Sequence, residues 1–249
     1  MNTELIRQSG LNIVDWNQPI YRVLSIQRFK EMIATKTIAL VRPSKWDDPF
    51  ENFFLKCKVN IGGGQIGSLR QIQEKWYGQC WTTNSDSDAM WRIYSPCKDG
   101  VRISTTIGRL FSAIYDTNDK FAQLKYFIGV VEYKTRKEIE EFIRRTSFMD
   151  LALGGQADKF ALTLCVKRPE FSHEKEVRLL INDVEAENHG DVLSIAFDYE
   201  KLLVDVALDP RLEGPRFEGL RSELISLGCS LPIAQSDLYK IDDMMIALE

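Results

Sequence analysis

The order of strand-like and helix-like segments is the feature that most limits the folds open to this chain. Strand-like patterns recur late in the chain, at 176–182, 191–197 and 204–210. Segments with helical spacing of apolar residues fall mainly in the first two thirds, at 25–35, 65–76, 87–94, 137–149 and 157–166. A doubly wound α/β fold requires regular alternation of strand and helix, which this order lacks. We therefore predict an α+β fold in which a mixed, largely antiparallel sheet forms the core and helices flank it.

Length and composition are those of an ordinary globular protein. The chain has 249 residues, of which 44% are hydrophobic and 27% charged, and it shows no internal repeat and no shift in composition that would mark a linker. We therefore expect residues 1–249 to form a single domain. The net charge of −4 argues against broad electrostatic binding to duplex nucleic acid or to an anionic membrane.

Cysteine usage and the amino-terminal residues point to the cytoplasm. The cysteines are odd in number, widely spread and not paired at zinc-finger spacing: Cys57, Cys80, Cys97, Cys165 and Cys229. Such thiols are typical of a reduced compartment and do not predict a structural metal. The first 16 residues lack a basic stretch followed by an apolar run, so we expect neither export nor membrane insertion.

The most informative segment for chemistry is 167–182, KRPEFSHEKEVRLLIN. If it is a strand, alternation places Val177, Leu179 and Ile181 on one face and Glu174, Glu176 and Arg178 on the other. Two neighbouring carboxylates repel each other, which drives their pKa values apart unless a cation such as Arg178 intervenes. Paired acids of this kind suit catalysis, but an edge strand with a solvated ladder of Glu and Arg has the same pattern.

Two further segments carry candidate site residues. In SKWDDPFE, Asp48, Pro49 and Glu51 have the spacing of a capped helix start, although Asp48 and Glu51 would also suit residues that orient a catalytic group. In the segment 85–100, Trp91 and Tyr94 are three residues apart and share a helix face. Large rings at this spacing usually belong to the core, and the alternative is an aromatic wall on which a nicotinamide or a nucleobase stacks.

The order of these motifs resembles that of an uncharacterised bacterial domain family. Members carry a tyrosine-arginine pair, which Tyr21 and Arg22 match, followed by an (N/D)DPFE motif, which residues 47–51 match. They then carry a tryptophan-tyrosine-glycine block, matched within 80–100, and a late E-x-E-x-R motif, matched by 174–178. The resemblance spans residues 20 to about 210. One departure is Phe171, where the family commonly has tryptophan, which keeps the aromatic packing but removes an indole donor.

This family layout is in turn similar to the ADP-ribosyltransferase fold, and the resemblance implies roles for several residues. Arg22, with Tyr21, would hold the dinucleotide, Trp91 or Tyr94 would lie beside the nicotinamide, and Arg178 would contribute to binding. Glu176 would be the catalytic carboxylate and Glu174 would orient the acceptor. NAD is then a substrate, and no metal is expected.

The sequence thus favours an NAD-dependent mono-ADP-ribosyltransferase toxin of a bacterial toxin-antitoxin or anti-phage system. Its acceptor would be a macromolecule, RNA or protein, and an antitoxin protein would be a partner. One alternative is a metal-dependent nuclease of an abortive-infection system, with Mg²⁺ held by acidic residues: Asp47, Asp48, Glu51, Glu174 and Glu176. The other alternative is a non-enzymatic interaction module in which the same acids and aromatic residues serve as caps, core and interface.

Overall fold

The computed structural model describes residues 8–46, 48, 58–62, 65–68, 74–145, 157–183 and 190–241. Its strands are β1 (Gly10–Leu11), β2 (Pro19–Ser25), β3 (Thr37–Val41), β4 (Lys58–Gly62), β5 (Gln65–Ser68), β6 (Trp76–Thr82), β7 (Gly100–Thr106), β8 (Tyr126–Val130), β9 (Glu132–Tyr133), β10 (Val166–Lys167), β11 (Glu176–Asn182), β12 (Val192–Ala196), β13 (Val206–Leu208) and β14 (Ile233–Gln235). Its helices are α2 (Ile26–Thr35), α5 (Asp88–Tyr94), α6 (Ile107–Ile114), α7 (Ala122–Lys125), α8 (Arg136–Arg145), α10 (Ala157–Thr163), α11 (Tyr199–Leu202) and α12 (Gly214–Ser226), with short 3-10 helices η1 (Pro43–Lys45), η2 (Pro169–Glu174) and η4 (Asp237–Tyr239).

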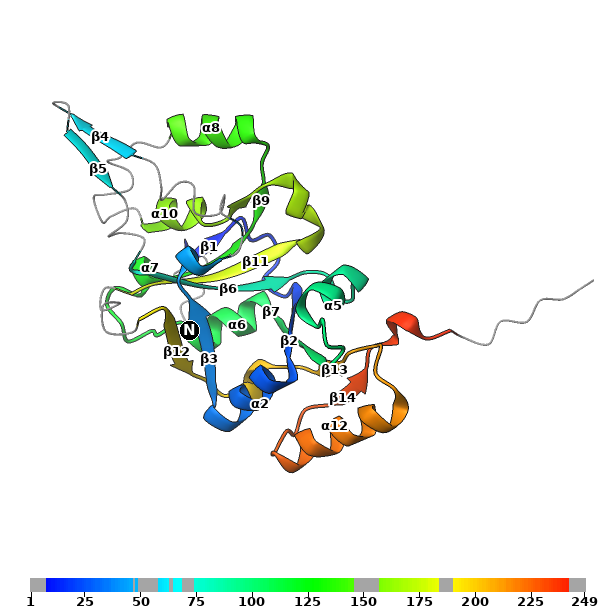
Figure 1. The fold of residues 1–249 in the computed structure, drawn as a ribbon. Coiled ribbons are helices and arrows are strands. Elements are labelled where there is room, and N and C mark those ends of the chain that lie inside the picture. Colours follow the sequence, from blue (N-terminus) through cyan, green and yellow to red (C-terminus); the bar gives the residue numbers. More distant parts are fainter. Residues whose placement is uncertain are drawn as a thin grey trace, which may run out of the picture.

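Ten of the described strands form one mixed sheet. Eight follow the order β1-β8-β11-β6-β2-β7-β13-β14, and β12 joins the sheet through β3, which pairs with β6 (Figure 1). Only β1–β8 and β13–β14 are parallel among the pairs of this sheet within the described residues. The predicted α+β class with a mixed, largely antiparallel sheet is therefore confirmed.

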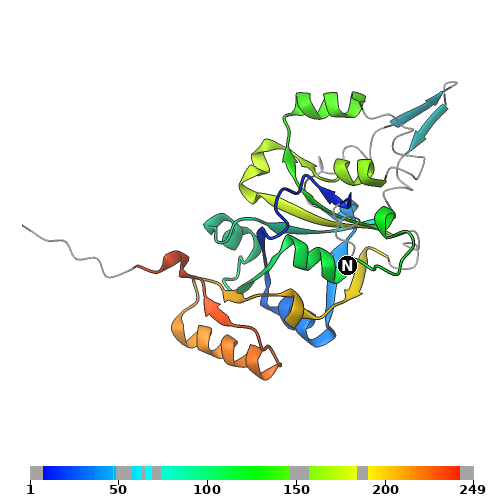
Figure 2. The ribbon, with the colours of Figure 1, turned by 180° about the vertical axis from the view of Figure 1, so that it is seen from behind.

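Apolar side chains cover both faces of the central strands. Helix α2 begins after Ser25, whose hydroxyl accepts a hydrogen bond from the backbone N–H of Arg28, and it buries Ile26, Phe29, Met32 and Ile33 as the sequence predicts. These residues join Val177, Leu179 and Ile181 of β11 in the main core, against which α6 also packs (Figure 2). A second core, built around Trp76, Phe160 and Leu180, covers the other face of β11.

The strand β11 lies inside the sheet, between β6 and β8. Six of its seven residues are buried, including Glu176 and Arg178. The interpretation of this segment as an edge strand with solvated charges is therefore wrong. The helix predicted at 65–76 is also wrong where the chain is described, because β5 occupies 65–68 and β6 begins at Trp76.

The sheet opens into a wedge along one edge of β6. The opposite edge of β6 pairs with β11 over its whole length, whereas β2 reaches β6 only at Tyr21 and Thr82, and β3 reaches it only at Val41 and Gly78. Because these two contacts lie at opposite ends of β6, β2 and β3 diverge, and α2 connects their far ends (Figure 1). The wedge exposes side chains from three strands that would otherwise be covered by a neighbour.

Candidate active site

Two cavities open in the wedge and share part of their lining. The first, of about 400 Å³, is bounded by β2, β6, α5 and the segment that enters β11, and its lining includes Tyr21, Arg22, Tyr94, Glu174 and Glu176. The second, of about 390 Å³, lies between β2, β3 and α2. Both volumes fall in the range of roughly 300–1,000 Å³ that small-molecule sites occupy. The early tyrosine-arginine pair and the two late glutamates therefore line one cavity, as the fold hypothesis requires.

Glu176 begins β11 and is held by two buried cations. Its Oε1 accepts from Arg178 Nε at 2.9 Å, and its Oε2 accepts from Arg178 Nη2 at 2.8 Å and from Lys167 Nζ at 3.3 Å. Burial alone would raise the pKa of Glu176, but the charge and hydrogen bonds of Arg178, followed by the charge of Lys167, outweigh it and lower the pKa to about 2. The carboxylate is therefore ionised throughout the physiological range.

Arg178 does not line either cavity, contrary to its predicted role in contacting the dinucleotide. Its side chain is 0% exposed, its Nη1 donates to the carbonyl oxygen of Leu164 at 2.6 Å, and its guanidinium lies 4.3 Å from the centre of the Trp46 ring. Because it binds both carboxylate oxygens of Glu176, Arg178 fixes the orientation of that side chain.

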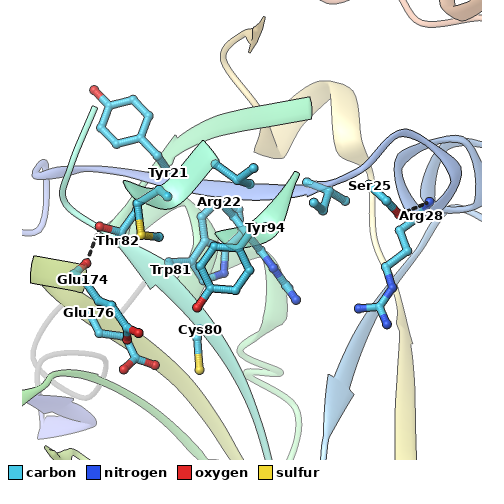
Figure 3. A pocket seen from close by; sticks show the side chains of 13 residues that line it. Tyr21, Arg22, Ser25, Arg28, Cys80, Trp81, Thr82, Tyr94, Glu174 and Glu176 are labelled. Carbon is cyan, nitrogen blue, oxygen red and sulfur yellow. Dashed lines mark hydrogen bonds between the residues drawn. The ribbon is translucent and has the colours of Figure 1, made fainter. Parts of the chain in front are cut away.

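Glu174 reaches the cavity from a different local structure than the one predicted. It ends η2, and the following residue, Lys175, has a left-handed backbone with φ of 41°, so the strand starts only at Glu176. The Thr82 hydroxyl donates to the backbone carbonyl of Glu174, and Asn84 Nδ2 donates to the carbonyl of His173 at 2.7 Å. This turn is thus tied to the end of β6, which places both carboxylates at one end of the cavity (Figure 3).

The two aromatic residues of α5 have different environments. Trp91 is 1% exposed, packs with Val23 and Met90, and does not line the cavities. It is therefore a core residue, and its position does not support the predicted contact with nicotinamide. Tyr94 is 42% exposed and its ring lies in the first cavity (Figure 3). Partial burial and the nearby carboxylates, Glu174 foremost, raise the pKa of Tyr94, so its hydroxyl stays neutral at physiological pH.

Two arginines stand where the cavities meet. Arg22 of β2 and Arg28 of α2 line both cavities, and Arg28 was not anticipated as a site residue. Among the described residues, neither guanidinium forms an ion pair or a side-chain hydrogen bond. Burial lowers the pKa of Arg22 to about 10, which still leaves it charged at neutral pH. Two neighbouring cations without a carboxylate partner in the described structure make this junction strongly favourable for an anion.

The remaining candidate residues lie around the first cavity or outside the described structure. Tyr21 lines that cavity, and the guanidinium of Arg102 lies 5.1 Å from its ring centre. Asp48 is buried and accepts a hydrogen bond from Arg168 Nη2 at 3.0 Å. It therefore holds Arg168, the residue that follows Lys167 in the chain. Glu51, Asp47 and the helix start expected after Asp48 lie outside the described residues.

Three residues around Glu176 were missed by sequence reasoning. Lys167 bridges the two carboxylates, Tyr133 Oη accepts a hydrogen bond from the backbone N–H of Glu176 at 2.9 Å, and Cys80 lines the same cavity as Glu176. The pairing of β9 with β10 brings Tyr133 opposite Lys167, which no local pattern reveals. The sequence weakly indicated Cys80, because alternation along residues 78–84 places its side chain on the same face of the strand as that of Thr82.

The described residues offer no cluster of side chains suited to a metal. No group of three or more His, Cys, Asp or Glu side chains in these parts of the chain is arranged to hold a metal ion. The described helices include none with the length and apolar character needed to cross a membrane.

Comparison with known proteins gives a family match and distant structural likenesses. Residues 90–179 match DUF2971, described as a protein of unknown function, while no protein of curated function matches the chain. DarT of Thermus sp. 2.9 in complex with NAD+ is similar with a TM-score of 0.41 and 12% identity, over 90% of this chain and 98% of DarT. The same protein in complex with ADP-ribosylated ssDNA gives a TM-score of 0.40 and 12% identity, over 88% and 94%.

Proposed function

We propose that this chain is an NAD-dependent mono-ADP-ribosyltransferase with Glu176 as the catalytic carboxylate. The observation that carries the proposal is the junction of two cavities at Arg22 and Arg28, with Glu176 in the wall of one of them. NAD consists of two nucleosides joined by a diphosphate, and its shape and charge match two cavities that meet at two guanidiniums. Guanidinium groups bind phosphate oxygens by strong charge-assisted hydrogen bonds.

The position of the glutamates orients the dinucleotide. Glu174 and Glu176 line only the first cavity, so the ribose that reacts, and with it the nicotinamide, belongs there. The exposed face of Tyr94 offers a surface on which the nicotinamide ring stacks. The second cavity, whose lining combines apolar side chains such as Ile38 and Trp81 with polar ones such as Thr35 and Gln79, would then accept the adenosine half.

The chemistry requires a fixed negative charge beside the ribose. The bond between ribose C1′ and the nicotinamide nitrogen breaks, its electron pair returns to that nitrogen, and the neutral nicotinamide leaves without being protonated. An ionised Glu176 stabilises the oxocarbenium-like centre and accepts a hydrogen bond from the ribose 2′-hydroxyl. The acceptor nucleophile then bonds to C1′ and loses its proton, and Glu174, in the same wall, orients that nucleophile.

The surroundings of Glu176 indicate how the ribose reaches it. An ionised carboxylate has about four acceptor sites. Arg178 occupies two of them and Lys167 a third. Glu176 also lines the cavity, next to Cys80, so the remaining acceptor site is the one that we assign to the ribose hydroxyl.

The acceptor in this proposal is a macromolecule, RNA or protein. Unpaired nucleobases stack on exposed aromatic rings and tolerate a modest overall charge, which suits Tyr94 and the acidic composition of the chain. The proposal includes a role as a bacterial toxin in the cytoplasm, with a cognate antitoxin protein as partner.

The test measures NAD consumption and transfer of label. We expect purified protein to release nicotinamide from NAD in the presence of cell lysate and of a chelator, and Glu176→Gln to abolish this release. Arg22→Gln and Arg28→Gln should each raise KM for NAD about 10- to 100-fold, because a charge-assisted hydrogen bond contributes about 1.5–3 kcal/mol. Arg216→Gln, which removes an exposed arginine of α12, is the control.

Labelled NAD identifies the acceptor in the same experiment. Loss of label from the macromolecular fraction after protease, ribonuclease or deoxyribonuclease names the acceptor as protein, RNA or DNA. Wild-type KM values for both arginine variants, or full turnover by Glu176→Gln, would contradict the proposed site.

A further inference from the structure

A small two-stranded sheet outside the main sheet supports the two glutamates. Strands β9 and β10 pair so that Tyr133 lies opposite Lys167, and both side chains contact the segment from Glu174 to Glu176. Lys167 Nζ lies 2.5 Å from Glu174 Oε2 and 3.3 Å from Glu176 Oε2. One ammonium group therefore joins two carboxylates that come from different secondary-structure elements.

This ammonium is well enclosed. The Lys167 side chain is 8% exposed, and its Nζ lies 4.7 Å from the centre of the Phe171 ring. The carboxylates that it joins are also nearly buried, with side-chain exposures of 11% for Glu174 and 4% for Glu176. Charges in such a setting are poorly screened by solvent, so the interaction of each carboxylate with its neighbours is strong.

Among the described residues, no other cation contacts both carboxylates. Arg178 of β11 contacts Glu176, and Arg168 contacts Asp48. Tyr133 of β9 and Tyr94 of α5 have raised pKa values and face the carboxylates as neutral groups, and Arg22 of β2 stands on the far side of Tyr94 (Figure 3). Within the described part of the chain, Lys167 is thus the cation that both carboxylates share.

We propose that Lys167 is a positioning residue whose ammonium keeps Glu174 and Glu176 ionised together and fixes their separation. This inference rests on the proposed function, in which Glu176 serves the ribose of NAD and Glu174 the acceptor nucleophile. Without the shared cation, the two like charges would repel, protonation of one carboxylate would become easier, and one of the two roles would be lost.

The first test uses stability and does not depend on activity. In the wild-type background, Glu174→Gln removes a partner of Lys167 and should lower the melting temperature. In the Lys167→Met background that contact is already absent, so the same substitution should lower the melting temperature by a smaller amount than in the wild type. If the Lys167→Met protein does not fold, folding of the double variant Lys167→Met/Glu174→Gln supports the inference. Failure of both proteins to fold overturns the inference, because that result shows that Lys167 is needed for packing.

The second test uses the pH dependence of NAD consumption. The charge of Lys167 helps to lower the pKa of Glu176, so loss of the ammonium should raise that pKa. Because the active form of Glu176 is ionised, the activity of Lys167→Met should begin to fall at a higher pH than that of the wild type as the pH is lowered. Lys167→Arg should restore the wild-type profile. Lys134→Met, which removes a lysine of the same region that pairs with Glu132, is the control with an unchanged profile.

The outcomes separate this inference from the proposed function. An equal effect of Glu174→Gln in both backgrounds overturns the inference, as does a wild-type pH profile in an active Lys167→Met protein. A smaller effect in the Lys167→Met background together with a wild-type protein that consumes no NAD leaves Lys167 as a cation that holds both carboxylates and refutes the transferase.

Discussion

Replacement of Glu176 by glutamine should destabilise the protein by an amount that depends on pH. The side chain is almost fully buried, and its interactions with Arg178 and Lys167 lower its pKa from 4.5 to about 2. Since a tenfold change in an equilibrium corresponds to about 1.4 kcal/mol, this difference gives about 3 kcal/mol of stability at pH 7. For a chain of this length, such a loss lowers the melting temperature by roughly 6–12 °C.

The direction of the pH effect follows from the lowered pKa. The stabilisation is complete above pH 4.5, the ordinary pKa of the carboxyl, and is lost as the pH falls towards about 2, the pKa in the folded protein. By pH 3, about 2 kcal/mol of it should be gone. The free-energy difference between the wild type and Glu176→Gln should therefore shrink from about 3 kcal/mol at pH 7 to about 1 kcal/mol at pH 3.

Urea denaturation followed by tryptophan fluorescence at pH 7, 5, 4 and 3 measures this difference. Glu170→Gln, which neutralises an exposed glutamate of η2, is the matched control and should change stability by less than about 0.5 kcal/mol. A free-energy difference that stays constant from pH 7 to pH 3 would refute the reasoning, because it would show that the carboxylate gains nothing from its charge in the folded protein.

Two further substitutions test how the site is supported. Asp209→Asn should lower the free energy of unfolding by about 3 kcal/mol in urea denaturation, because Arg211 would lose its counter-charge. Buried Asp209 accepts hydrogen bonds from Arg211 and from Ser95, each at 2.6 Å. An effect below about 0.5 kcal/mol would contradict this expectation. Gly78→Ala should destabilise by about 1–3 kcal/mol in the same assay, because its Cβ would lie 2.6 Å from Cζ2 of Trp46; wild-type stability would show that the Trp46 ring moves without cost.

The sequence was a good guide where local pattern decides structure. The helical spacing of Ile26 and its neighbours placed the buried face of α2 correctly, and alternation along β11 placed Val177, Leu179 and Ile181 in the core. These patterns persist because each side chain is sorted by its own hydrophobicity and by the period of its element.

The errors arise where distant segments decide the outcome. Whether β11 is an edge or a central strand depends on β6 and β8, which lie about 100 and 50 residues earlier in the chain, and alternation alone cannot distinguish the two positions. Glu174 was assigned to the strand because the left-handed conformation of Lys175, a residue type that rarely adopts it, interrupts the pattern without a glycine signal. Lys167 escaped notice because its role exists only once β9 pairs with β10.

The elements that carry the site are held in different ways, and this difference bears on function. Glu176 lies on a central strand, with its backbone paired to Thr82 of β6 on one side and bonded to Val131 on the other, and Arg22 is paired with β7 along the edge of the wedge. Tyr94 ends a seven-residue helix, and the carbonyl groups of Trp91 within it and of Ser95 just after it accept hydrogen bonds from Arg211 at 3.0 and 2.7 Å. Because Arg211 lies near the C-terminal part of the described chain, the ring proposed to stack on nicotinamide is held from a region outside the motifs that supply the charges. Binding of the dinucleotide would then be set by the strands, and the position of the Tyr94 ring by the contact between α5 and Arg211.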